Sequence, residues 1–182
     1  MAHGSPAPLT AAGSPDTILV AASYQIPLLW LSLFSESDLK TVEIVLEDAE
    51  GNETTGGVPT LEGATEILQT RYQVRARTLL ARIPAELHPH IKEWETLLVS
   101  VKEPFMQIDL AEIWMMFMPD DLDHVIRGEL RAFEEGGELW RNVCNQAGLE
   151  VDTASGRISF DPAIARYGLR GYEWYVPVPW SD

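Results

Sequence analysis

Short apolar runs and alternating positions predict several β-strands. Residues 18–22 and 42–46 are rich in β-branched and apolar side chains, and turn-forming residues follow the second run. Apolar positions alternate with polar ones over residues 105–110, which favours a strand followed by a helical turn. Two more strands are predicted at residues 157–160 and 172–178. Prolines close the last of these, so we expect it at a sheet edge.

Longer segments with helical spacing predict most of the remaining structure. Residues 61–83 repeat apolar side chains at the helical period, and Pro84 follows; residues 85–101 predict a second helix that forms a hairpin with the first. Residues 27–34 suit a short apolar helix. A further helix begins at Asp120 and is broken at Gly136-Gly137, and residues 138–147 predict a short helix that ends at Gly148.

The order of these elements predicts an α+β fold with a small mixed or antiparallel sheet and several helices packed on one side. We expect one compact domain over residues 16–182, preceded by a flexible segment at residues 1–15 that is rich in Ala, Pro, Gly and Ser. The glycine-rich residues 49–63 predict a long loop. Such a loop is either a solvated connector or a contact surface.

One uncharged run, residues 17–35, is close in length to a membrane-spanning helix. Polar residues and Pro27 interrupt its centre, and no Lys or Arg precedes Asp16 as a secretory signal would require. We therefore read the run as a buried strand followed by a short helix. The expectation is a protein without a membrane segment, in the cytoplasm by default.

Charge narrows the range of partners. The chain of 182 residues carries 13 Lys and Arg against 28 Asp and Glu, a formal net charge of −15. A dispersed negative field repels nucleic acid and attracts basic proteins, although acidity for solubility alone is the alternative. The exception is a cluster at Arg71, Arg75, Arg77 and Arg82. It either binds a phosphate or carboxylate or pairs with acidic neighbours, and in an acidic chain we favour pairing.

Candidate catalytic and metal-binding residues are few. His88 and His90 flank a proline with poor geometry for two metal bonds, and a zinc site would need Glu86 or Glu93 as a third ligand. The acids before His124 lack the glycine and distal glutamate of a calcium loop, and acids are favoured in a first helical turn. We expect neither a metal nor another cofactor.

Other nucleophiles and motifs give little support for catalysis. Cys144 lies on an apolar helical face without an activating neighbour, so we expect a buried structural thiol. The nucleophile-elbow, phosphate-loop and dinucleotide-binding glycine patterns are all missing from the sequence. Carboxylate pairs for glycoside chemistry stay open, because 28 acids supply many pairs and a sequence gives no distances.

The six tryptophans divide into two groups. Four fall on apolar helical faces and are predicted in the core: Trp30, Trp94, Trp114 and Trp140. Trp174 and Trp180 lie in the proline-rich tail with Tyr172 and Tyr175, where they either pack on the sheet or form an interface.

In size and composition the chain is similar to the immunity proteins of bacterial toxin systems, many of which neutralise cationic toxins. The dispersed negative charge and the missing catalytic motifs predict a non-enzymatic, acidic protein-binding module. The resemblance implies one form of such a module, an immunity-type inhibitor of a basic protein. The acids that flank the predicted turns are the candidate partner-binding residues: Glu47, Asp48, Glu50, Glu53, Asp120, Asp121 and Asp123.

Two other hypotheses stay open. One is a small hydrolase-like enzyme with His88, His90 or His124 beside a carboxylate in a cleft. The other is a structural subunit that forms a homo-oligomer.

Overall fold

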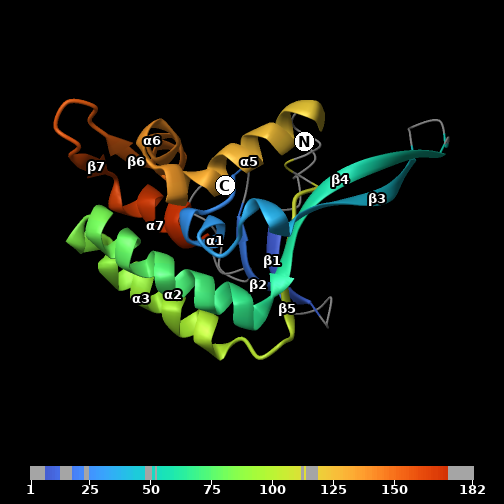
Figure 1. Ribbon diagram of the computed structural model, residues 1–182, viewed down its shortest axis with the longest axis horizontal. Helices are drawn as coiled ribbons and strands as arrows, with labels where there is room; N and C mark the ends of the chain where they lie inside the picture. The colour runs from blue at the N-terminus through green and yellow to red at the C-terminus, as the bar shows by residue number, and fades with distance from the viewer. Residues whose placement is uncertain are drawn as a thin grey trace.

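The computed structural model describes residues 7–12, 18–22, 25–47, 51, 53–111, 113 and 119–171. In this part of the chain the fold is α+β, as predicted, with helices gathered on one side of an antiparallel sheet (Figure 1). The five strands of this sheet, in the described residues, follow the order β2-β1-β5-β4-β3. They are β1 (Ala7–Ala12), β2 (Ile18–Ala22), β3 (Leu39–Glu47), β4 (Glu53–Ala64) and β5 (Phe105–Asp109).

Three of these strands confirm the predictions from apolar runs and alternation. Residues 18–22 form β2, residues 42–46 lie inside β3, and the run at 105–110 forms β5. The predicted strand at 157–160 is also present, as β7 (Ile158–Phe160), which pairs antiparallel with β6 (Leu149–Val151). Residues 172–178 lie outside the described part of the chain.

The N-terminal boundary of the domain differs from the prediction. Residues 7–12 were expected to precede the domain, yet they form β1 between β2 and β5. The small side chains of this segment give a weak local signal, and two neighbouring ladders override it. Pro8 pairs only with β2, because the β5 ladder begins at Leu9. Proline is tolerated there since no second ladder needs its missing donor.

The prediction of a loop at residues 49–63 is wrong for most of these residues. Residues 53–64 form β4, which pairs with β3 from Glu47↔Glu53 to Leu39↔Leu61 and with β5 from Thr60 onward. Pro59 lies just before the β5 ladder, where its missing N–H is not required on that side. Gly57 fits closely against β3, since a Cβ there would lie 2.7 Å from the Thr41 methyl carbon. Pairing with β3 and β5 therefore overrides the tendency of these glycines and Pro59 to form a loop.

The predicted helices are present with shifted ends. The segment 61–83 forms a helix only from Thr65, because β4 takes its first residues. Gly136 and Gly137 interrupt the helical segment as expected, with φ of 66° and 58°. The helices are α1 (Leu28–Leu31), the 3-10 turns η1 (Glu36–Asp38) and η2 (Ala85–Leu87), α2 (Thr65–Arg82), α3 (His88–Ser100), α5 (Pro119–Glu135), α6 (Gly137–Gln146) and α7 (Pro162–Arg170).

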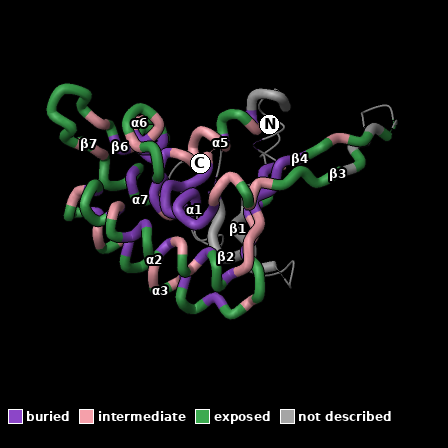
Figure 2. The backbone as a smooth tube through the Cα atoms, viewed as in Figure 1, coloured by how far each residue is buried: buried purple, intermediate pink, exposed green. Residues whose placement is uncertain are grey.

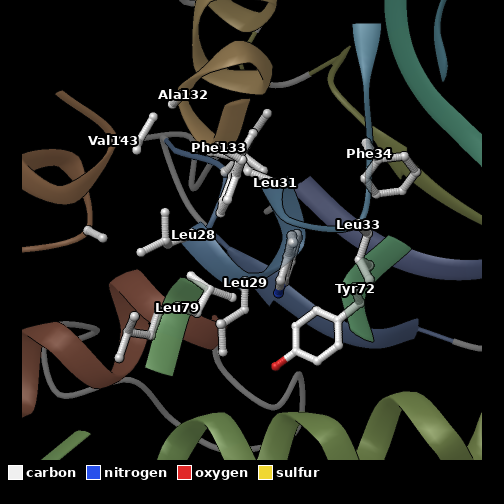
Figure 3. Packing of buried hydrophobic residues seen from close by; sticks show 14 of the residues in the cluster. Leu28, Leu29, Leu31, Leu33, Phe34, Tyr72, Leu79, Ala132, Phe133 and Val143 are labelled. Atoms are coloured by element: carbon white, nitrogen blue, oxygen red, sulfur yellow. The ribbon is translucent and has the colours of Figure 1, made fainter. Parts of the chain in front are cut away.

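The core is centred on the short helix α1, whose four residues are all buried (Figure 2). Its side chains meet Tyr72 and Leu79 of α2 and Phe133 of α5 (Figure 3). The indole Nε1 of Trp30 donates a hydrogen bond to the Arg170 carbonyl of α7 at 2.9 Å. The uncharged run at residues 17–35 is thus a strand and a buried helix. Over the described residues, no helix has both the length and the apolar character to cross a membrane.

Candidate functional site

The outer part of the β3–β4 hairpin projects away from the helices (Figure 1). We call residues 41–47 and 53–57 the arm. Side chains at successive strand positions point to opposite faces, and residues 41, 42 and 43 are all exposed (Figure 2). The side chains of Val42 and Val45, on opposite faces, are 46% and 65% exposed. Neither face of the arm is therefore covered by the described part of the chain.

The arm carries three acids and no Lys or Arg of its own. Its acids are Glu43, Glu47 and Glu53, and the register sets Glu47 directly opposite Glu53. Like charges in opposed positions of an antiparallel pair destabilise it. The single base between residues 39 and 64 is Lys40, whose Nζ lies 2.6 Å from Glu62 Oε1 at the root of the hairpin. Within the described residues, Glu43 and Glu53 meet no Lys or Arg.

The first group of predicted partner-binding acids coincides with the end of the arm. Glu53 is exposed at the start of β4, and Glu47 ends β3. Asp48 and Glu50 lie outside the described residues. The structure thus brings two of the four positions to one end of the hairpin, as neighbours across the ladder.

The second group of predicted acids has a different environment. Asp120 and Asp121 begin α5, in the turn where the helix dipole favours acids. Asp123 Oδ2 accepts a hydrogen bond from Arg127 Nε at 2.7 Å, and Arg127 in turn lies 3.9 Å from Glu36 of η1. An arginine therefore neutralises Asp123, unlike Glu43 and Glu53.

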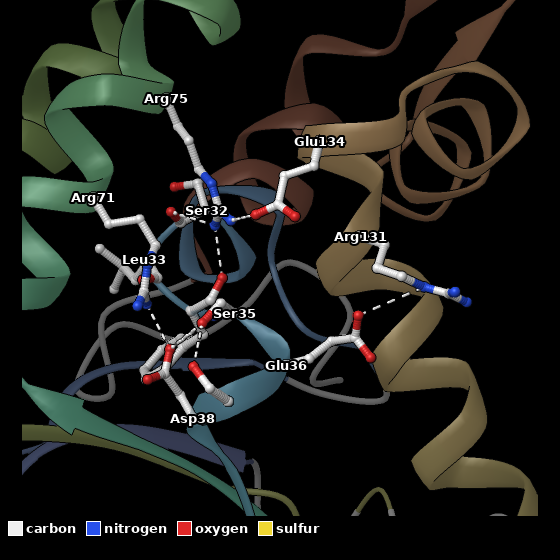
Figure 4. A network of polar contacts seen from close by, with 11 residues as sticks. Ser32, Leu33, Ser35, Glu36, Asp38, Arg71, Arg75, Arg131 and Glu134 are labelled. Atoms are coloured by element: carbon white, nitrogen blue, oxygen red, sulfur yellow. Dashed lines mark hydrogen bonds and ion pairs between the residues drawn. The ribbon is translucent and has the colours of Figure 1, made fainter.

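Two arginines of the cluster, Arg71 and Arg75, pair with acidic neighbours, as we favoured (Figure 4). Arg71 Nη1 contacts Asp38 Oδ2 and donates to the Leu33 carbonyl at 2.7 Å. Arg75 donates to the carbonyls of Ser32 and Phe34 at 3.1 and 2.6 Å and pairs with Glu134 at 2.9 Å. These carbonyls follow the buried helix α1 and need donors.

Arg71 and Arg75 accordingly form a structural clamp around the end of α1, and the anion-binding alternative is not supported for these two arginines. Burial lowers the pKa of Arg75, and the hydrogen bond to Glu134 opposes that effect. Arg82 stacks over the Trp140 ring, with Cζ 5.0 Å from the ring centroid, and Arg77 is exposed.

The three candidate histidines, His88, His90 and His124, have different surroundings. His88 Nε2 is 3.1 Å from the Ile83 carbonyl, His90 Nδ1 is 3.6 Å from Glu93, and His124 is exposed on α5. Among the residues that the structure describes, no three His, Cys, Asp or Glu side chains gather as a metal site would require. None of the three histidines lines the cavity between α2 and α3 or the cavity beside α5.

Buried residues agree with the prediction where the structure describes them. Cys144 is fully buried, and burial raises the pKa of its thiol to about 12, while Arg82 lowers it by a smaller amount. Trp30, Trp94 and Trp140 belong to the core as expected. Trp114, Trp174 and Trp180, with Tyr172 and Tyr175, lie outside the described residues.

Sequence analysis overlooked one carboxylate, Glu129 of α5. It lines a cavity of about 430 Å³ that α5 forms with α6 and with the residues before α1. Burial raises the pKa of Glu129 to about 7, and a hydrogen bond with Gln146 opposes the rise. The signal was available, because Glu129 follows Leu122 by seven residues and Ile126 by three, which places it on the apolar face of the helix.

Comparison with known proteins gives no relative: no protein-family model, curated protein or solved structure matches the chain.

Proposed function

We propose that the protein is a non-enzymatic binding module that docks onto a basic protein through the arm. The observation that supports the proposal most directly is the pairing of Glu47 with Glu53 on a hairpin whose neighbouring side chains are exposed on both faces. Glu43 and Glu53 meet no Lys or Arg in the described residues, and like charges at the opposed positions 47 and 53 disfavour the strand pair. A cationic partner would remove that cost on binding.

The exposed valines add the apolar component that a protein interface requires. Interfaces combine a desolvated apolar centre with polar surroundings. Val45 lies between Glu43 and Glu47 along β3 and pairs with Thr55 across the ladder. A partner surface with an apolar depression surrounded by Lys or Arg would complement this face of the arm. The negative field of the whole chain would also speed its approach.

An inhibitor of a basic protein is one form of such a module. The size and charge that the chain shares with immunity proteins support this finer proposal, in which the arm covers the cationic working surface of its target. The arm suits that use because it reaches beyond the body of the molecule (Figure 1).

Affinity capture from the native host tests the proposal, with two matched double variants. Glu43→Lys/Glu53→Lys reverses the arm, and Glu86→Lys/Glu150→Lys reverses two exposed acids on η2 and β6. Each reversal adds two charges, so both variants change the net charge from −15 to −11. We expect mass spectrometry to find a basic protein that the wild type and the body variant retain and the arm variant loses. The proposal is wrong if no protein shows this pattern.

A further inference from the structure

The cavity beside Glu129 is separate from the arm. It lies where α5 and α6 pack together, near the residues that lead into α1, and its volume is about 430 Å³. Small-molecule sites typically enclose about 300 to 1,000 Å³ and are mainly apolar with a few polar groups. Here Ile26, Leu122 and Ile126 supply apolar surface, while Gln25, Glu129 and Gln146 supply the polar groups.

Glu129 is the charged group of this lining. Transfer of a carboxylate into apolar surroundings is costly unless a cation or several hydrogen bonds compensate. The Gln146 side chain provides one hydrogen bond, and the described lining contains no Lys, Arg or His. The carboxyl group therefore has an amide neighbour but no counter-ion in its own cavity.

We propose that this cavity binds a small amine, whose apolar body contacts Ile26, Leu122 and Ile126 and whose ammonium group pairs with Glu129. The chemistry of the lining selects this class. An apolar molecule without charge leaves the carboxylate uncompensated, and an anion is repelled by it. A bare metal ion would find one carboxylate and amide oxygens among apolar side chains, which is a poor donor set. An ammonium group donates hydrogen bonds to the carboxylate and adds charge attraction.

The inference does not depend on the proposed function. The arm lies on the β3–β4 hairpin, and substitutions in the cavity leave its acids unchanged. A protein that docks through the arm can also hold a small ligand between α5 and α6.

Calorimetric titration with three probes of similar shape tests the proposal at pH 8, where the Glu129 carboxyl is mainly ionised. The probes are hexylamine, 1-hexanol and hexanoate. We expect hexylamine to bind with one site per chain and at least about tenfold more tightly than 1-hexanol, because a hydrogen bond to a charged group contributes that much or more. Hexanoate should bind more weakly than either.

Two variants separate the cavity from surface charge. Glu129→Gln keeps the shape of the side chain and should abolish the preference for hexylamine over 1-hexanol. Glu138→Gln changes an exposed acid of the adjacent helix α6 and should keep it. No saturable binding of hexylamine, equal binding of the amine and the alcohol, or an unchanged preference in Glu129→Gln would overturn the proposal. A loss of the preference in both variants would also overturn it, because the cavity would not be its source.

Discussion

Glu43 and Glu53 on the arm and Asp38 and Glu134 in the body are all carboxylates near the surface, but within the part of the chain that the structure describes only the second pair meets arginines. Asp38 holds Arg71 and accepts a hydrogen bond from the Ser35 backbone N–H, and Glu134 holds Arg75. The arm has no arginine at all and opposes Glu47 to Glu53. Among the described residues, acids thus complete an arginine network in one region and have no such partner in the other.

The difference separates two uses of negative charge. In the body, the arginines need acidic partners because they satisfy carbonyls at the buried end of α1, and the acids complete that clamp. In the arm, the carboxylates satisfy no local donor in the described residues. A feature that costs stability and has no local purpose is a candidate for function. The predictions below test whether the body is as tightly packed, and the arm as open, as this comparison requires.

Thiol labelling should give the largest contrast. A Val45→Cys variant places a thiol on the arm while keeping native Cys144 in the body. Raising the pKa of a thiol from 9.0 to about 12 lowers its thiolate fraction about a thousandfold at neutral pH. We expect an aromatic disulfide reagent at pH 7.5 to react in two phases whose rates differ by at least about that factor. The wild type, which lacks the arm thiol, should show only the slow phase.

Equal rates in the two phases would mean that the arm is covered or that the body opens readily. Labelling in denaturant provides the control, because both thiols should then react at similar rates.

Removal of the clamp should destabilise the fold strongly. Arg75→Met keeps much of the apolar stem but deletes the donors to the Ser32 and Phe34 carbonyls and the pair with Glu134. Because buried carbonyls then lack partners, we expect the free energy of unfolding to fall by about 3 kcal/mol in urea denaturation. Arg77→Met changes an exposed arginine of the same helix and should stay within about 0.5 kcal/mol. Similar effects in both variants would refute the clamp.

Glu129 predicts a pH dependence of stability in the body. Its folded pKa of about 7 exceeds the ordinary 4.5, so the folded chain binds more protons than the unfolded chain between these values. This contribution to stability is fully present below about pH 4.5 and is lost as the pH rises through about 7, by up to about 3 kcal/mol. Urea denaturation at pH 5 and pH 8 should show a loss for the wild type that Glu129→Gln largely removes. An identical pH dependence in the two proteins would contradict the raised pKa of Glu129.

Charge reversal on the arm should have the smallest effect on stability. Glu53→Lys removes the like charge opposite position 47, and neither Glu53→Lys nor Glu43→Lys breaks an ion pair or hydrogen bond within the described residues. We expect each to change the free energy of unfolding by less than about 0.5 kcal/mol, with an increase favoured. Asp38→Lys, by contrast, breaks the pair with Arg71 and should destabilise. If Glu43→Lys destabilises as much as Asp38→Lys, the arm carboxylates have local partners and the comparison fails.

The spacing of apolar residues correctly predicted the helices and strands that have a strong local sequence preference. The apolar faces of α3 and α6 repeat at helical spacing, and the runs in β2 and β3 are β-branched, so sequence and structure agree there. β1 and β4 were missed because neighbouring strands stabilise them against weak propensity, with prolines placed outside the β5 ladder. Helix α7 was overlooked although Asp161 caps it and Pro162 occupies its first turn, a recognisable start signal.

The sequence allowed the acids of the candidate site to be predicted, but not which of them are paired with arginines in the fold. Pairing depends on residues distant in sequence: Arg71 reaches Asp38, and Arg75 reaches Glu134. Sequence alone therefore cannot show that Asp38 and Glu134 are paired with arginines. The pair of Asp123 with Arg127 was predictable, because the two residues lie four apart on one helix. The projection of the arm could not be predicted from the sequence either. It depends on the position along β4 at which pairing with β5 ends.

The most direct test of the account is the rate at which the captured basic partner associates with each of the two double variants. The rate is measured at low and high salt, with the variant immobilised on a sensor surface. Electrostatic steering raises association rates by roughly 10–10³-fold and weakens as salt screens the charges. We predict that Glu43→Lys/Glu53→Lys slows association at least about tenfold at low salt and flattens its salt dependence, while Glu86→Lys/Glu150→Lys stays within about twofold of the wild type. Equal slowing by both variants would contradict the account, because net charge rather than the arm would then guide the partner.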